Sequence, residues 1–262
     1  RAMRINTLKI SKERFLDLCP WRTKQSELLN EGLILTENPE HIGTHPYHIA
    51  GLFYMQEPSA MSVVEAAEIA PGMRVLDLCA APGGKSLTLA ECMQNQGKLI
   101  SGEYVESRVP LLRKAFARCG VTCAEAVQND AAQLRSDWGK FDRILCDVPC
   151  SGLGVIAKKP DIRYKDLDGI ENLLLSQQKI LQNGADLLAE NGRLVYSTCT
   201  VNRDENEEQV KTFLENNPRF HVAVPALQLP GMQQGEYGTL FLPHKTATDG
   251  FFAAILETES TQ

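Results

Sequence analysis

Two cysteines lie in sequence motifs that could place them together in a reactive site. Cys150 lies in DVPCSG (147–152), and Cys199 lies in STCT (197–200). Each follows an apolar stretch that is typical of a buried strand, at 143–146 and at 193–197. Neighbouring parallel strands lie about 4.8 Å apart, and their carboxyl ends meet at the edge where ligands bind. If these two strands are neighbours, both thiols face one cleft, and Asp147 lies between them and a ligand at that edge.

Methylation of cytosine at C5 is one reaction that needs such a set of groups. C5 reacts poorly with a methyl donor until a thiolate adds to C6 and makes C5 enamine-like. A base must afterwards remove the C5 proton, and an acid near N3 stabilises charge on the ring. One attacking cysteine, one assisting cysteine and Asp147 meet these needs. Chemistry alone leaves open which cysteine attacks.

A cofactor site is indicated by the loop Cys79-Ala80-Ala81-Pro82-Gly83-Gly84-Lys85, which lies between a predicted strand and a predicted helix. Small residues there let a ligand approach the backbone and the free N–H groups of the helix. The loop matches neither G-x-G-x-x-G nor the P-loop. Carboxylates follow three predicted strands, at Glu103, Asp130 and Asp147. They would repel phosphates but suit the sulfonium of S-adenosylmethionine, and Glu103 lies where an acid binds ribose hydroxyls.

The elements that must position these groups alternate along most of the chain. Apolar strands are predicted at 74–78, 99–103, 121–127, 143–146, 193–197 and 251–256, and helices at 60–70, 86–93, 108–119 and 170–188. This alternation predicts a doubly wound, mainly parallel α/β sheet of the Rossmann type.

The first 57 residues have a different pattern and predict a small αβ module. We expect strands at 3–10 and 32–35, and a helix that begins after Ser11 as its N-cap. The domain division is therefore a module over 1–57, which we expect to contact RNA, and a catalytic domain over 58–262.

The composition excludes some classes of protein. The chain has 262 residues and a net charge of −6, so it is not a uniformly basic nucleic-acid binder. No apolar run approaches the ~18 residues of a membrane helix. Eight cysteines without a C-x-x-C pair favour reduced thiols, and we expect no metal site, not even at His41, His45 and His48. We expect a cytoplasmic monomer without membrane contact.

The motifs together resemble the Sun/Fmu-type RNA (cytosine-5) methyltransferases, especially the bacterial enzymes that modify small-subunit (16S) ribosomal RNA. The similar segments are RINTLKIS (4–11), GLFYMQEPSAM (51–61), DLCAAPGGK (77–85), FDRILCDVPCSGLGVIAKKPDIRY (141–164), LVYSTCTVNRDENE (194–207) and LPHKTATDGFFAAIL (242–256). Val148 stands where the family usually has Ala, and Tyr164 where Trp is common.

The resemblance implies roles for individual residues. Cys199 is implied as the nucleophile toward C6, and Cys150 as the thiol that helps to release the product. Residues 79–85, Glu103, Asp130 and Asp147 are implied as contacts of S-adenosylmethionine, and Asp147 also as a contact of the target base.

RNA, as ribosomal RNA or a small-subunit assembly intermediate, is the implied partner. Contacts are expected from a basic group beside the Cys150 loop, Lys158, Lys159, Arg163 and Tyr164, and from a second one, Arg1, Arg4, Lys9, Lys12 and Arg14. Two alternatives remain: cytosine-5 methylation of another RNA such as tRNA, and a non-catalytic RNA-binding or assembly factor with the same fold. Because the net charge is negative, we expect only modest binding of bare RNA.

Overall fold

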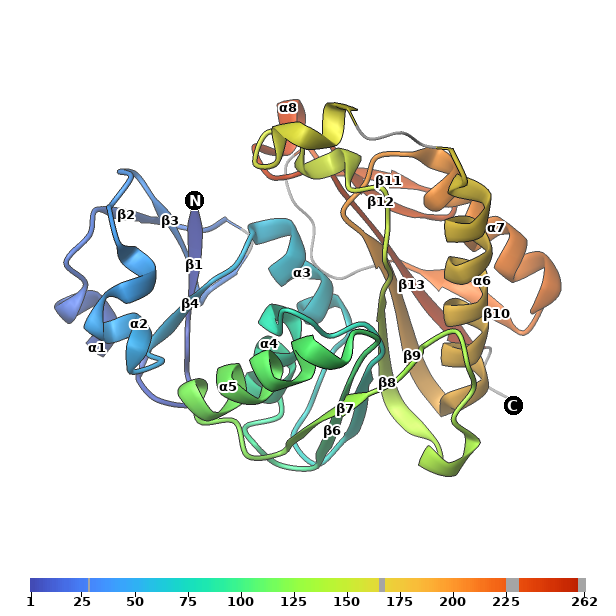
Figure 1. Cartoon of the computed structure of the whole chain (residues 1–262), viewed down its shortest axis with the longest axis horizontal. Helices are drawn as coiled ribbons and strands as arrows, with labels where there is room; N and C mark the ends of the chain where they lie inside the picture. Colours follow the sequence, from blue (N-terminus) through green and yellow to red (C-terminus); the bar gives the residue numbers. More distant parts are fainter. Residues whose placement is uncertain (28, 165–167, 225–230, 259–262) are drawn as a thin grey trace.

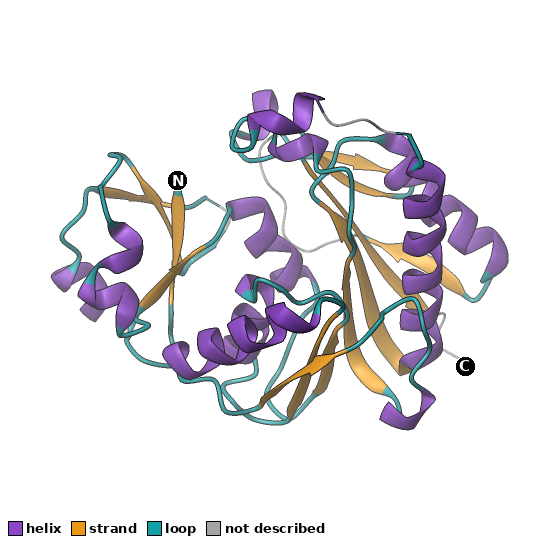
Figure 2. Ribbon diagram, viewed as in Figure 1, coloured by secondary structure: helices purple, strands orange, loops and turns teal. Residues whose placement is uncertain are grey.

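The computed structural model describes residues 1–27, 29–164, 168–224 and 231–258. The described chain contains a four-stranded sheet near the N-terminus and a larger sheet of nine strands. Figure 1 shows the small sheet at one end of the molecule and helices on both faces of the large one. The predicted doubly wound α/β fold with a small N-terminal αβ module is confirmed (Figure 2).

Five parallel strands form the part of the large sheet that carries the predicted site. Their spatial order is β9-β8-β5-β6-β7, and every neighbouring pair is parallel. The strands are β5 (Arg74–Asp77), β6 (Lys98–Glu103), β7 (Ala124–Gln128), β8 (Phe141–Asp147) and β9 (Leu188–Thr198). All five lie at positions where the apolar pattern predicted a strand.

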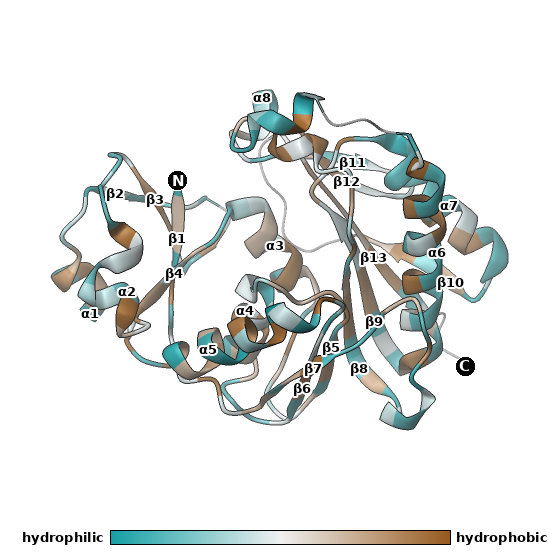
Figure 3. Ribbon diagram, viewed as in Figure 1, coloured by the Kyte–Doolittle hydropathy of each residue, from teal (hydrophilic) through white to brown (hydrophobic). Residues whose placement is uncertain are grey.

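The parallel strands bury both faces, because helices cover each side. Ile144 of β8 packs in one core with Leu181 of α6 (Ile170–Leu187), and α7 (Glu207–Asn216) lies on the same side. The next residue of β8, Leu145, packs in a second core with Leu89 of α4 (Gly84–Cys92). The helix α3 (Pro58–Ala66) belongs to this second core, and α5 (Val109–Cys119) lies beside α4. Figure 3 shows hydrophobic residues along the strands and mixed hydropathy on α6, as expected for a helix with one buried face.

Four antiparallel strands extend the sheet beyond β9. β13 (Phe251–Thr258), predicted from its apolar run, pairs with β9, and β12 (Gly238–Phe241) and β11 (Gln233–Gly235) follow it outward. β10 (Phe220–Ala223) pairs with residues 255–258 of β13, beyond the part of β13 that pairs with β12. A short helix, α8 (Pro243–Thr246), precedes β13.

The N-terminal module is an antiparallel sheet in the order β2-β3-β1-β4. The strands are β1 (Ala2–Ile5), β2 (Thr23–Gln25), β3 (Gly32–Leu35) and β4 (Phe53–Met55), with the helices α1 (Lys12–Leu18) and α2 (Pro46–Ile49) beside them. Ser11 caps α1, as predicted, by accepting a hydrogen bond from the Arg14 N–H. The strand predicted at 3–10 is wrong beyond Ile5. Asn6 turns the chain there by donating to the Gly51 and Cys119 carbonyls and accepting from the Leu8 N–H.

The helix predicted at 60–70 instead spans Pro58–Ala66. It begins earlier because Glu57 caps it, accepting hydrogen bonds from the N–H groups of Ser59 and Ala60. It ends earlier because Glu68 adopts a positive φ of 50°, which stops the helical path.

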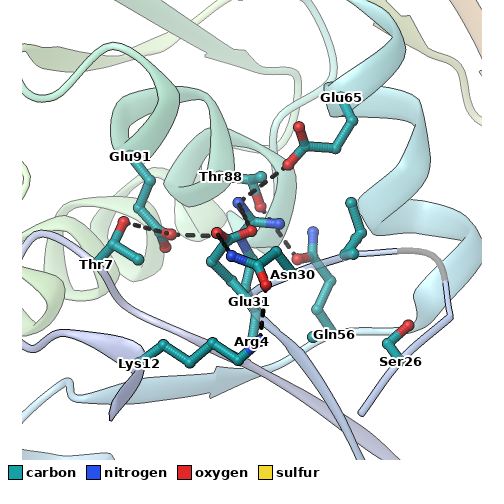
Figure 4. Close-up of polar contacts among 12 residues, drawn as sticks. Arg4, Thr7, Lys12, Ser26, Asn30, Glu31, Gln56, Glu65, Thr88 and Glu91 are labelled. Atoms are coloured by element: carbon teal, nitrogen blue, oxygen red, sulfur yellow. Dashed lines mark hydrogen bonds and ion pairs between the residues drawn. The ribbon is translucent and has the colours of Figure 1, made fainter. Parts of the chain in front are cut away.

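Arg4 joins the N-terminal module to the helices α3 and α4 of the large α/β part (Figure 4). Its guanidinium lies 3.3 Å from Glu91 of α4, 3.2 Å from Glu65 of α3 and 3.8 Å from Glu31. Only 3% of the Arg4 side chain is exposed, so the expectation that it contacts RNA is wrong. A charged side chain with three carboxylates around it is stable out of water, whereas the sequence pattern showed it only as part of a basic group.

Candidate active site

The two thiols meet at one edge of the sheet. β8 and β9 are parallel neighbours, with Asp147 opposite Ser197, as the shared-cleft hypothesis required. Cys150 lies three residues beyond the end of β8, and Cys199 directly follows β9. Their Sγ atoms are 3.2 Å apart.

The chain backbone holds the two thiol loops together. The Gly154 N–H donates to the Cys199 carbonyl at 3.0 Å, and the Gly250 N–H donates to the Gly154 carbonyl at 2.9 Å. A Cβ atom at Gly154 would lie 2.0 Å from the Gly250 oxygen, so only glycine fits there. The segment before β13 therefore packs directly on the loop that carries Cys150.

The electrostatic surroundings make the two thiols unequal. The hydrogen bond from Cys150 lowers the pKa of Cys199, and the positive charge of Lys85 adds to this effect against burial and Asp147. The same hydrogen bond, followed by burial and the charge of Cys199, raises the pKa of Cys150. Of the two thiols, Cys199 therefore loses its proton more readily. Since the thiolate is the nucleophilic form, these surroundings favour Cys199 for attack.

Lys85 and Asp147 form an ion pair beside the thiols. The Lys85 Nζ lies 2.7 Å from Asp147 Oδ2 and 5.3 Å from the centre of the Phe251 ring. The Ser197 hydroxyl donates to the other oxygen of Asp147 at 2.8 Å. Burial by itself would lower the pKa of Lys85, but the charge and the hydrogen bond of Asp147 raise it, and the net pKa is raised. The ammonium group therefore keeps its proton.

A cavity of about 610 Å³ connects the thiols to the other predicted carboxylates. Glu103 at the end of β6 and Asp130 after β7 line it together with Asp147. Both cysteines line the same cavity. The carboxyl ends of the parallel strands thus bring Glu103 and Cys199, which are 96 positions apart, to one cavity.

The residues of the loop 79–85 lie in different surroundings. Cys79 and Ala81 line the cavity, while Ala80 is buried in the core beside α5. Pro82 follows a cis peptide bond, and Gly83, with a φ of 110°, directly precedes α4. Gly84 and Lys85 are the first residues of that helix. The Lys85 side chain reaches Asp147, so it lies at the thiol end of the site.

Two further residues belong to this cavity that the sequence did not single out. Arg108 lines it and places a guanidinium nitrogen 3.4 Å from Glu103 Oε1. Tyr104, directly after Glu103, lines it with an exposed ring. The available signal was their position between β6 and α5, because residues that follow parallel strands line this edge.

The basic residues near the Cys150 loop lie at the surface. Tyr164, in the 3₁₀ helix Pro160–Tyr164, is 86% exposed, and Lys159 and Arg163 are also exposed. Lys158 forms an ion pair with Asp249 at 2.7 Å. In the second basic group, Lys9 donates to the Ala50 and Arg118 carbonyls.

A family model described as 16S rRNA methyltransferase RsmB/F matches residues 65–257, which include the cavity and both thiols. The chain belongs to this family. A second model, the N-terminal domain of 16S rRNA methyltransferase RsmF, matches residues 1–58. The fold and the resemblance of the motifs to bacterial rRNA methyltransferases are thereby confirmed.

Curated relatives match nearly the whole chain. The ribosomal RNA small subunit methyltransferase F of Cronobacter sakazakii is 37% identical, over 98% of this chain and 56% of its own length. The probable ribosomal RNA small subunit methyltransferase B of Bacillus subtilis is 35% identical, over 96% of this chain and 58% of its own length. The chain thus spans somewhat more than half the length of these relatives.

A solved structure has the same fold. A methyltransferase homolog protein from Pyrococcus horikoshii superposes with a TM-score of 0.85 and 29% identity, over 98% of this chain and 86% of that chain. Among the described residues of the present chain, no helix is long and apolar enough to span a membrane.

Proposed function

We propose that this chain methylates C5 of a cytosine in RNA, with 16S rRNA as the substrate and S-adenosylmethionine as the methyl donor. The observation that carries the proposal is the pair of thiols 3.2 Å apart at the end of an acidic cavity. Membership of the RsmB/F family supports the choice of 16S rRNA. The names of the curated relatives support it as well.

The cavity fits a cofactor that carries a positive charge and no phosphate. Glu103 suits the ribose hydroxyls, and Asp130 adds a second acceptor in the same cavity. Arg108 already balances part of the Glu103 charge. When bound, the cofactor supplies an electrophilic methyl group, and the acidic lining favours its sulfonium.

Cys199 starts the reaction by adding its sulfur to C6 of the cytosine. The bond to C6 forms from the thiolate electron pair, and the ring electrons move to C5, which then takes the methyl group. Lys85 and Asp147 lie beside the thiols and are the groups available to the polar edge of the ring. The positive charge of Lys85 stabilises the electron density that the ring gains, and the Asp147 carboxylate holds that ammonium group in place.

Cys150 completes the reaction as the base. Once Cys199 is bonded to carbon, its sulfur carries no charge and is a weaker hydrogen-bond acceptor, so two of the causes that raise the pKa of Cys150 are weakened. Cys150 then loses its proton to solvent and removes the proton from C5. The ring double bond reforms, and Cys199 leaves as a thiolate. The close contact of the two sulfurs thus gives each thiol its role in turn.

The N-terminal module, residues 1–57, and the surface around Tyr164 are the proposed RNA contacts. Lys159 and Arg163 supply positive charge beside the Cys150 loop, and Tyr164 supplies an exposed ring for stacking on a base. A target cytosine in a stem must be flipped out to reach Cys199.

Transfer of a radiolabelled methyl group tests the proposal. The protein is incubated with labelled S-adenosylmethionine and, in separate reactions, with 16S rRNA, small-subunit particles and tRNA. We expect 5-methylcytosine in the 16S rRNA, free or in particles. Labelling of tRNA alone would overturn the substrate, and no labelling of any RNA would favour the non-catalytic alternative.

A further inference from the structure

One buried carboxylate near the site has no role in the proposed chemistry. Glu205 lies in the 3₁₀ helix Arg203–Glu205, and its side chain is inaccessible to solvent. It follows Cys199 by six residues but is turned back beneath the thiol loops. A buried charge is costly unless hydrogen bonds satisfy it, so the contacts of Glu205 indicate what it does.

The carboxylate of Glu205 is bonded to the loop that carries Cys150. Its Oε2 accepts from the Ser151 N–H at 2.8 Å, and its Oε1 accepts from the Ser151 hydroxyl at 2.5 Å. Gln177 of α6 donates to Oε2 at 3.1 Å and also to the Pro149 carbonyl at 2.9 Å. The residues on both sides of Cys150 are therefore fixed to Glu205, one directly and one through Gln177.

The same residue is bonded to the loop that carries Cys199. Asn202 donates to Oε1 at 3.1 Å, and the Tyr196 hydroxyl of β9 donates to the Glu205 carbonyl at 2.6 Å. The Ser151 and Thr200 hydroxyls are 2.9 Å apart and join the two loops a second time. All of these donors are neutral, so hydrogen bonds, and not ion pairs, hold the two loops to Glu205.

We propose that Glu205 is a positioning residue that fixes Cys150 against Cys199, so that one thiol can donate its hydrogen bond to the other. The inference rests on the proposed function, since it concerns the same two thiols. Glu205 acts through the loops and touches neither sulfur. Its removal should separate the sulfurs and take away the hydrogen bond that favours the Cys199 thiolate.

The test is the isosteric substitution Glu205→Gln, which turns one acceptor oxygen into an NH₂ group that faces donors. Its readout in the absence of RNA is the rate at which iodoacetamide alkylates Cys199, followed against pH on the tryptic peptide 194–203, which contains no other cysteine. We expect the pH midpoint of alkylation to rise by about one unit. We expect kcat to fall by about 10²-fold, as for a misplaced reacting group, with S-adenosylmethionine affinity within about twofold of wild type.

Glu208→Gln is the matched control, because Glu208 is a partly exposed glutamate of α7 that pairs with Arg203. It should leave both readouts unchanged. If Glu205→Gln does not fold, Ser151→Ala replaces it, since that change removes the hydroxyl donor but keeps the backbone N–H. It should raise the alkylation midpoint in the same direction by a smaller amount.

An alkylation profile of the folded variant that matches wild type would overturn the proposal, even if kcat were lower, because a purely structural role does not alter the thiolate. Failure of the proposed function is distinguishable, since it would leave wild type without methyl transfer. The alkylation readout needs neither RNA nor turnover.

Discussion

Two clusters of buried charge in this molecule differ in how completely protein encloses them. At the junction, Arg4 and Glu91 expose only 3% and 2% of their side chains, and the partners of Arg4 come from α3, α4 and the N-terminal module. At the thiol site, Lys85 and Asp147 expose 15% and 26%, and Asp147 lines the cavity. The enclosed cluster fixes two parts of the chain to each other, whereas the open one leaves one side for a ligand.

Ion pairs within one molecule can thus have different roles. Breaking the enclosed cluster leaves an uncompensated buried charge and should lower stability. Changing the open one should mainly alter reactivity, because water can reach the charge that remains.

The largest effect is expected from Cys199→Ala. Without the attacking sulfur, C5 is not activated, and kcat should fall by a factor on the order of 10⁴ or more. The loss is measured as labelled methyl transfer to 16S rRNA at saturating S-adenosylmethionine. Cys123→Ala, at a half-buried cysteine beside β7, is the control and should keep its activity. Appreciable transfer by Cys199→Ala would contradict the assignment of the nucleophile.

Arg4→Met should lower the free energy of unfolding by about 3–5 kcal/mol, because it leaves Glu91 buried without its cation. Urea denaturation followed by circular dichroism measures the change. Arg14→Met, at an exposed residue of α1, should change stability by less than about 0.5 kcal/mol. The specific activity of the folded Arg4 variant should stay close to wild type. Lost activity with unchanged stability would mean that the junction belongs to the functional site.

Lys85→Gln should shift the pH dependence of Cys199. The ammonium group lowers the pKa of Cys199, so its removal raises that pKa and shrinks the thiolate fraction at pH 7. A shift of one unit corresponds to about tenfold slower alkylation at neutral pH, with recovery as the pH rises. Alkylation of the peptide 194–203 across pH measures this.

Lys140→Gln is the control for that experiment. Lys140 directly precedes β8, at the opposite end of the strand from Asp147, and donates a hydrogen bond to the Asp186 carbonyl. It should reproduce the wild-type profile. A Lys85→Gln profile that also coincided with wild type would show that Lys85 does not stabilise the thiolate.

The smallest effect is expected at the surface. Lys159→Ala should weaken RNA binding a few-fold and reduce the slope of log affinity against log salt by about 0.7–0.9. Lys158→Ala should have less effect, because Lys158 is already paired with Asp249. Fluorescence anisotropy with labelled RNA over a salt series compares the two. Equal slopes in both variants would contradict the proposed contact surface.

The sequence was most informative where the physics is local or periodic. The apolar runs placed β5 to β9, and their shared carboxyl edge brought Glu103, Asp130 and Asp147 to one cavity. The division of roles between the thiols could not be derived in this way, because it depends on a 3.2 Å contact between sulfurs 49 residues apart.

Side-chain burial was the other limit. A charge pattern cannot distinguish Arg4, which is enclosed by glutamates from three segments, from an exposed arginine such as Arg14. Glu205 was equally hidden, because its acidic stretch is typical of an exposed helix start and its partners Ser151 and Gln177 come from distant segments. The burial of Arg4 and Glu205 therefore depends on contacts between distant segments, which a sequence pattern does not show.

The most direct test of the central claim, that Cys199 attacks and Cys150 releases, is a denaturing gel of the Cys150→Ala variant after reaction with 16S rRNA and S-adenosylmethionine. Without the base, the methylated adduct should persist and migrate as a covalent protein–RNA species. The double variant Cys150→Ala with Cys199→Ala should give no such band. Absence of the band in Cys150→Ala, or its presence in the double variant, would contradict the account.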